Sequence, residues 1–90
     1  MTSAARQFEI LNQRGLHARA AAKFVKTASA FVAKIDVCHG GTEVCGTSIM
    51  GLMMLAASKG SVISVHATGE DAEAAVEALA MLVRNRFDED

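Results

Sequence analysis

A stretch near the middle of the chain has the pattern of a β-hairpin with one apolar and one polar face. Residues 34–39 and 42–45 alternate between apolar and polar side chains, and Gly40-Gly41 stands between them as a two-residue turn. The pattern predicts a half-buried sheet that needs a cover on one side only. The apolar face of the predicted hairpin holds Ile35, Val37 and Val44, and the polar face holds Lys34, Asp36, Cys38 and Glu43.

The other periodic segments complete an order of strand, helix, strand, strand, helix, strand and helix. This order predicts a single α+β domain over residues 1–90, an open-faced sandwich in which three helices cover one face of a four-stranded antiparallel sheet. A ferredoxin-like split βαβ module would give much the same order, so the order leaves both folds open. The remaining strands are predicted at 8–11 and 62–68, and the helices at 18–30, 48–57 and 70–85.

Charge and hydropathy exclude two classes of partner. The formal net charge is -1 and the sequence has no dense run of Lys and Arg, which argues against binding to nucleic acid. The longest apolar run, 49–57, is far below the roughly 20 residues that span a membrane. The N-terminus also lacks the apolar region of a signal peptide. We therefore expect a cytoplasmic protein that does not insert into membranes.

The two cysteines are predicted to lie diagonally across the hairpin and to remain free thiols. Diagonal neighbours sit about 7–8 Å apart, at or beyond the reach of a disulfide, and cytoplasmic thiols stay reduced. The predicted cross-strand pairs are Cys38 with Glu43 and Asp36 with Cys45.

The sequence offers no metal site. His39 stands beside the hairpin turn and His66 alternates onto the polar side of a strand, so neither joins a cluster with ligand spacing. We expect both to be plain surface residues, and we expect no metal and no cofactor.

The helix predicted over 18–30 begins in an unusual way, with His17 at its N-cap. Helix starts usually have Ser, Thr, Asp or Asn at the cap and acidic residues in the first turn. This helix has no acidic residue between 18 and 30, and it adds Arg19 instead. The free amides and the guanidinium together favour an anion from elsewhere, such as a phosphate. A tolerated cap and a solvated arginine are the plainer alternative.

The last predicted helix follows the rule that the first one breaks. Glu70 and Asp71 come at its start, and Arg84 and Arg86 come at its end, which matches the helix dipole. Residues 68–71 also resemble a capping box. The contrast supports a functional interpretation of His17 and Arg19.

The middle helix, predicted over 48–57, has Ser48 as its N-cap and is apolar on almost every side. A surface helix with this pattern indicates docking, for which adaptable methionines are suited. A short helix buried in a small core is the alternative. We expect Ile49, Leu52, Met53 and Ala56 to face the sheet, and Met50, Met54 and Ala57 to lie on other faces.

Three motifs stand in order along the chain, at 15–21, at 47–53, and at 57–60 followed by 67–69. Together they resemble those of HPr, the histidine phosphocarrier family of the bacterial phosphotransferase system. The sequence Gly-Leu-His-Ala-Arg-Ala-Ala at 15–21 resembles the active centre, and 47–53 resembles the second signature. Ala-Ser-Lys-Gly at 57–60 and Ala-Thr-Gly at 67–69 follow in the expected order. The tail Phe-Asp-Glu-Asp at 87–90 and Met-Met-Leu at 53–55 are most similar to the nitrogen-system branch, NPr.

The resemblance implies a covalent phosphoryl carrier rather than a stand-alone enzyme. His17 would accept a phosphoryl group on Nδ1 from enzyme I and pass it to an enzyme IIA-type protein. Arg19 and the backbone amides of Ala18, Arg19 and Ala20 would hold the phosphate, and neutral imidazole would be the attacking form. Many family members have Pro where Ala20 stands. The output would be sugar transport or nitrogen regulation.

The resemblance also implies control and docking around the second signature. In some lineages the serine matching Ser48 is phosphorylated by an HPr kinase/phosphorylase, although Thr47 stands where Lys is common. We expect a monomer, and the alternative is a non-transferring regulatory binding module of the same family. Arg19, Lys23 and Lys26 lie along one helical stripe, which we expect to frame the methionines, and an ordinary solvated helix face is the alternative. The expected docking residues are Ala22, Lys23, Lys26, Met50, Met53 and Met54.

Overall fold

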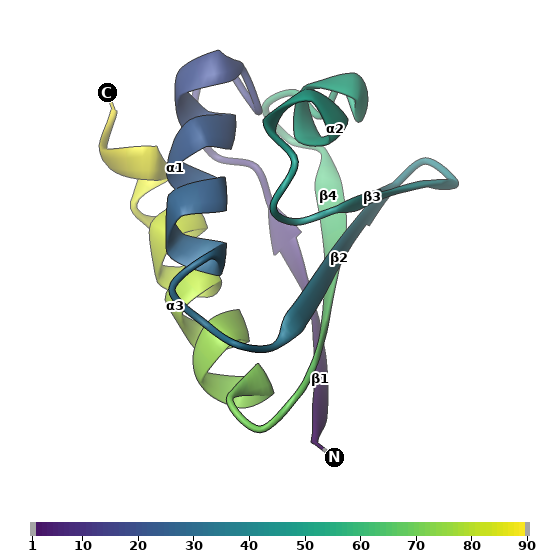
Figure 1. The fold of residues 1–90 in the computed structure, drawn as a ribbon. Helices are drawn as coiled ribbons and strands as arrows, with labels where there is room; N and C mark the ends of the chain where they lie inside the picture. Colours follow the sequence, from purple (N-terminus) through teal and green to yellow (C-terminus); the bar gives the residue numbers. More distant parts are fainter. Residues whose placement is uncertain (1, 90) are drawn as a thin grey trace.

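The computed structural model describes residues 2–89, and its elements follow the predicted order (Figure 1). The first strand and helix lead into a hairpin, and a short second helix, a fourth strand and a long third helix follow. A 3-10 turn, η1, is the last element of the described residues. The elements are β1 (Ser3–Glu9), α1 (Ala18–Ala28), β2 (Lys34–His39), β3 (Thr42–Cys45), α2 (Ile49–Met54), β4 (Val62–Thr68), α3 (Ala72–Arg84) and η1 (Arg86–Asp88).

The four strands form one antiparallel sheet in the order β1-β4-β2-β3. The hairpin prediction is confirmed in register, because Cys38 lies opposite Glu43 and Asp36 lies opposite Cys45. Its turn depends on glycine, since Gly40 and Gly41 have φ values of 56° and 84°. Both cysteines have free thiols.

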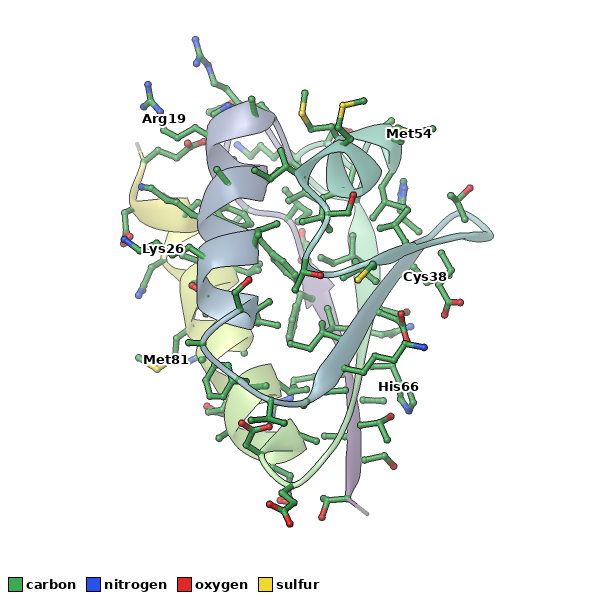
Figure 2. All side chains as sticks on the ribbon, in the orientation of Figure 1. Arg19, Lys26, Cys38, Met54, His66 and Met81 are labelled. Carbon is green, nitrogen blue, oxygen red and sulfur yellow. The ribbon has the colours of Figure 1, made fainter. Side chains whose placement is uncertain are left out.

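The helices lie on one side of the sheet, and the core fills the space between the two layers (Figure 1). Inward residues of β2 and β4 alternate with outward ones, as the sequence predicts. Figure 2 shows Cys38 and His66 on the side of the sheet away from the helices. The largest fully buried side chains include Phe24, Phe87, Ile10, Ile35, Leu52, Ile63 and Leu79.

Strand β1 starts earlier than its sequence indicates. It begins at Ser3 rather than at residue 8, and Phe8 is its only fully buried residue. As an edge strand, β1 is held by its backbone pairing with β4 and shows little hydrophobic alternation. The pairing continues past its end, because Ile10 N–H donates to Ser61 and the Ile10 carbonyl accepts from Gly60. Both long helices are also shorter than predicted, by two or three residues.

Helix α2 differs most from its prediction. It ends at Met54 rather than near residue 57, because Ala56 takes a left-handed φ of 53°. Only Leu52 is buried within it. Ile49, Met53 and Ala56 are exposed rather than turned to the sheet, whereas Leu55 and Ala57 beyond the helix are buried.

Two polar residues have roles that the sequence did not indicate. The capping box at 68–71 was wrong, because Asp71 is the N-cap of α3 but makes no side-chain bond to it. Its carboxylate instead accepts hydrogen bonds of 2.8 Å from the amides of Val32 and Ala33, which ties the α1–β2 loop to α3. His39 is half-buried rather than a plain surface residue, and its Nδ1 lies 2.8 Å from the Leu55 carbonyl oxygen.

None of the helices in the described part of the chain has the length and apolar character needed to cross a membrane.

Candidate phosphoryl-transfer site

A close backbone approach fixes the loop before α1. Gly15 has a φ of +65°, and a Cβ there would collide with the carbonyl oxygen of Ala57 and the Cα of Ser58. The next residue, Leu16, is buried and donates its N–H to the same Ala57 carbonyl at 2.9 Å. The Gly-Leu pair therefore clamps the loop against the segment after α2 and sets where His17 stands.

His17 is the N-cap of α1, as predicted, but it does not cap the helix with its side chain. Its backbone is extended, with φ -77° and ψ 178°, and the imidazole makes no hydrogen bond to the first turn. The backbone carbonyl accepts the bond from Ala21 at 2.8 Å that begins α1. The amides of Ala18, Arg19 and Ala20 precede that bond, and the first turn has no acidic residue. They are free to bind an anion.

An acidic residue reaches the imidazole from the far end of the chain. The carboxylate of Glu89 lies 2.8 Å and 3.0 Å, through its two oxygens, from Nε2 of His17. Asn12 donates from Nδ2 to Glu89 Oε1 at 2.7 Å and to the Gly15 carbonyl at 2.8 Å. Figure 1 shows the C-terminal segment returning alongside the start of α1.

The tail that presents Glu89 is anchored by a buried ring and a lysine. Phe87 is completely buried, and its carbonyl accepts a 2.7 Å hydrogen bond from Nζ of Lys23. Arg86, Phe87 and Asp88 have left-handed φ values of 57°, 54° and 61°, a conformation that non-glycine residues adopt rarely. The packing of Phe87 holds this turn in place.

Glu89 carries its negative charge at neutral pH. Burial raises the pKa of its carboxyl, but hydrogen bonds from Asn12 and His17 and the positive charges of His17 and Arg19 outweigh that effect. The pKa therefore lies below the ordinary value of 4.5. Glu89 is an acceptor only, so the imidazole must donate Nε2–H to it.

Arg19 points into solvent at the same end of the molecule as Met54 (Figure 2). It lines a pocket of about 400 Å³ together with Gln13, Arg14 and Glu89. This pocket has two guanidinium groups and opens beside the start of α1. An anion bound there would meet Arg19 without any rearrangement of the fold.

Ser48 caps α2 as predicted. Its Oγ accepts the N–H of Gly51 at 2.9 Å, and the residue itself is half-buried. The neighbouring methionines form an exposed apolar surface, with Met50 and Met54 72% and 75% exposed and Met53 44% exposed.

The predicted docking residues are exposed with one exception. Ala22 and Lys26 lie on the outer surface of α1, which packs beside α2. Lys23 is half-buried and its ammonium group is used in the bond to Phe87, so it holds the tail as well as adding charge. Ala20, at the position where Pro is common in the resembled family, is fully buried and continues the helix.

The sequence analysis missed Asn12 and Glu89. Neither has a local pattern that marks it, because Glu89 is 72 residues from His17. One indirect signal was present, since the first turn of α1 has no acidic residue and so lacks a partner for its positive field. No group of three His, Cys, Asp or Glu residues within 2–89 is arranged to hold a metal ion.

Known proteins share this fold and much of this sequence. The family model described as the PTS HPr component phosphorylation site matches residues 4–85. The phosphocarrier protein HPr of Xylella fastidiosa (strain Temecula1) is 49% identical over 84 residues, which cover 93% of this chain and 94% of that one. The phosphocarrier protein NPr of Shewanella violacea is 43% identical over 89 residues, which cover 99% and 98%.

Similarity to a solved structure extends over the whole chain. The crystal structure of HPr from Thermoanaerobacter tengcongensis gives a TM-score of 0.89 at 43% identity, covering 100% of this chain and 99% of that chain. This match decides between the two folds that the element order left open, in favour of the HPr-like sandwich.

The fold and the site define a phosphocarrier of the phosphotransferase system, a class that relays a phosphoryl group and is not a conventional enzyme. The chain belongs to the HPr family of that system. The NPr relative supports the predicted link to nitrogen regulation.

Proposed function

We propose that His17 carries the phosphoryl group as a covalent phosphohistidine, received from enzyme I and delivered to an enzyme IIA-type acceptor. The observation that carries this proposal is the hydrogen bonding of the two imidazole nitrogens. Its Nε2 is held by Glu89, whereas no bond to Nδ1 is present within residues 2–89, beside a helix start with free amides. We also infer a cytoplasmic monomer, as the family resemblance implies.

The transfer passes the phosphoryl group from a phosphohistidine of the donor protein to His17, and electrons and protons balance between the two imidazoles. The lone pair on Nδ1 of His17 forms the new N–P bond, and the pair in the donor's N–P bond returns to the donor nitrogen. The proton on Nε2 stays in place, so the positive charge on the ring moves with the phosphoryl group. No base and no metal ion is needed from this chain for such a step.

The start of α1 supplies electrostatic stabilisation for the group in transit. Phosphoryl transfer spreads negative charge over three equatorial oxygens, which positioned donors stabilise. The amides of Ala18, Arg19 and Ala20 and the guanidinium of Arg19 are the donors that this site offers.

Docking would use the exposed methionines of α2 and the outer face of α1. The pairing of apolar side chains with Arg19 and Lys26 suits a partner surface that is apolar at its centre and acidic at its rim. One surface of adaptable methionines can serve a donor and an acceptor in turn.

Phosphorylation of Ser48 by an HPr kinase/phosphorylase would regulate this surface. A phosphate on Ser48 adds about -1.5 to -2 charge next to the apolar surface that contacts the partner, which weakens docking. The N-terminus of α2 tolerates this negative charge, so the fold is kept. We expect Ser48→Asp to fold normally and to raise the KM of enzyme I for the carrier. An unchanged KM would contradict this.

The test is reconstitution with phosphoenolpyruvate and each of the two kinds of enzyme I, the sugar type and the nitrogen type. Intact mass should show one added phosphate that is lost in acid, survives alkali and is absent from His17→Ala. Labelling by one enzyme I only would also assign the branch. A protein that neither enzyme modifies would contradict the carrier and favour the regulatory binding module.

A further inference from the structure

Glu89 holds the imidazole at the nitrogen that does not receive the phosphate. Both of its oxygens lie within 3.0 Å of Nε2, and the side chains of His17 and Glu89 are only 22% and 13% exposed. Because an ionised carboxylate cannot donate, this contact requires the proton to be on Nε2. In its neutral form, the ring then presents its lone pair at Nδ1.

The structure holds the carboxylate at this position at an energetic cost. Asn12 is fully buried and uses both hydrogens of its amide, one on Glu89 and one on the Gly15 carbonyl. Its own Oδ1 is buried and has no hydrogen-bond partner among the described residues, and an unpaired buried oxygen lowers the stability of the fold. The left-handed turn at 86–88 is a second cost.

We propose that Glu89 is a positioning residue for phosphoryl transfer, which rests on the function proposed for His17. Its carboxylate fixes the tautomer in which Nδ1 is the nucleophile. It also balances the positive charge on the ring once Nδ1 is bonded to phosphorus and Nε2 still carries its proton. Partners of this kind set both the orientation and the tautomer of functional histidines.

The geometry makes Glu89→Gln the most informative variant. Asn12 would continue to donate to the oxygen of the new side chain, since it is a donor at that point. The amide NH₂ of glutamine would then occupy the position of Oε2, 2.8 Å from Nε2 in the native protein. The nearest neighbour of Nε2 would then be a donor, and the oxygen that stays at 3.0 Å also accepts from Asn12. We therefore expect the proton to move from Nε2 and the Nδ1–H form, which lacks the nucleophile, to predominate.

The experiment measures the tautomer and the transfer rate in the same set of proteins. Long-range ¹⁵N–¹H correlation spectra of the His17 ring at mildly alkaline pH should show Nε2–H in the native protein and Nδ1–H in Glu89→Gln. Glu89→Ala should give a mixture. Asp88→Asn is the matched control, because it removes one charge from the same tail at a carboxylate that has no bond to His17. This carboxylate is 68% exposed and lies 4.0 Å from Nζ of Lys23, whose 2.7 Å bond to the Phe87 carbonyl does not involve it.

Steady-state transfer from phosphorylated enzyme I should show the same order. We expect the maximal rate to fall roughly 10- to 100-fold in Glu89→Gln, less in Glu89→Ala and not at all in Asp88→Asn. The KM for the carrier should be unchanged, since the ring and not the docking surface is altered. A tail that only packs against the domain would instead tolerate the isosteric glutamine.

The outcomes separate the two proposals. A native protein that accepts phosphate, with Glu89→Gln equal to it in tautomer and maximal rate, overturns the role of Glu89 and leaves the carrier intact. A native protein that takes no phosphate overturns the proposed function, whatever the tautomer. If Glu89→Gln fails to fold by circular dichroism, Glu89→Ala decides, and a native-like tautomer and rate in it overturn the role.

Discussion

The starts of α1 and α2 differ in where each obtains its hydrogen-bonding partner. At α2, the side chain of Ser48 accepts the Gly51 amide at 2.9 Å, three residues away. At α1, the side chain of His17 makes no bond to its own helix and contacts Glu89 from the opposite end of the chain. One helix start completes itself locally, and the other keeps its amides free.

This difference separates a structural cap from a chemical site. A satisfied cap stabilises its helix and leaves little unpaired polarity for a ligand. The start of α1 lacks that stabilisation, but its amides, Arg19 and the imidazole all remain able to bind a phosphoryl group. Substitutions at the two starts should therefore affect different measurements.

Apart from the loss of His17 itself, the largest effect is expected at Arg19. Replacing Arg19 by Ala removes one charged donor to the phosphate, and such bonds contribute roughly 1.5–3 kcal/mol, or about a 10- to 100-fold change in rate. We expect transfer from enzyme I to slow by this amount, with the melting temperature unchanged. Steady-state kinetics measure it, and Lys26→Ala, on the same helix, is the control for lost charge. An equal effect of both variants would show that Arg19 acts only through docking.

A smaller effect is expected at the loop that presents His17. Gly15→Ala places a Cβ against the Ala57 carbonyl at a left-handed φ, so we expect the free energy of unfolding to fall by about 1–3 kcal/mol. Urea denaturation measures the change. Gly41→Ala is a useful comparison, because its φ is also positive but a Cβ there meets nothing within 4 Å. If the two cost the same, the contact with Ala57 is unimportant.

At the start of α2, Ser48→Ala should reduce the free energy of unfolding by about 1 kcal/mol, the usual loss for a serine cap. Phosphorylation of His17 should continue at the native rate, because the cap bond is local. Thermal melting and the labelling reaction are run on the same sample. A large loss of labelling with no loss of stability would reverse the comparison between the two starts.

The smallest effect concerns Asp71 at the start of α3. The hydrogen bond from Val32 has the largest effect and lowers the pKa of the Asp71 carboxyl. Burial raises this pKa, and the hydrogen bond from Ala33 lowers it again, so that it lies below the ordinary 3.8. The stabilisation is therefore present above about pH 4 and is lost as the pH falls through the lower folded value. We expect the difference in melting temperature between the native protein and Asp71→Asn to shrink on acidification. A difference that does not depend on pH would contradict the assignment.

Features that depend on neighbouring residues could be predicted from the sequence. The register of β2 and β3, the bounds of β4, the cap at Ser48 and the position of His17 all follow from spacing within a few residues. The element order followed as well, although a second fold with the same order was excluded only by the strand order of the sheet and by comparison with known HPr proteins.

Features that depend on distant contacts could not be predicted. The first part of β1 has no clear alternation because its backbone pairing with β4 holds it. Asp71 looks like a local cap, but the amides that donate hydrogen bonds to its carboxylate lie 38 and 39 residues away. The contact between His17 and Glu89 closes a still longer loop, so spacing along the chain carries no trace of it.

The most direct test of the account is whether the phosphate leaves His17 again. The protein would be loaded by enzyme I and phosphoenolpyruvate, separated from both, and mixed with an enzyme IIA-type acceptor while intact mass is followed for each protein. The account predicts that the added mass disappears from this chain and appears on the acceptor. Phosphate that stays on the chain while a functional acceptor is present would contradict a carrier.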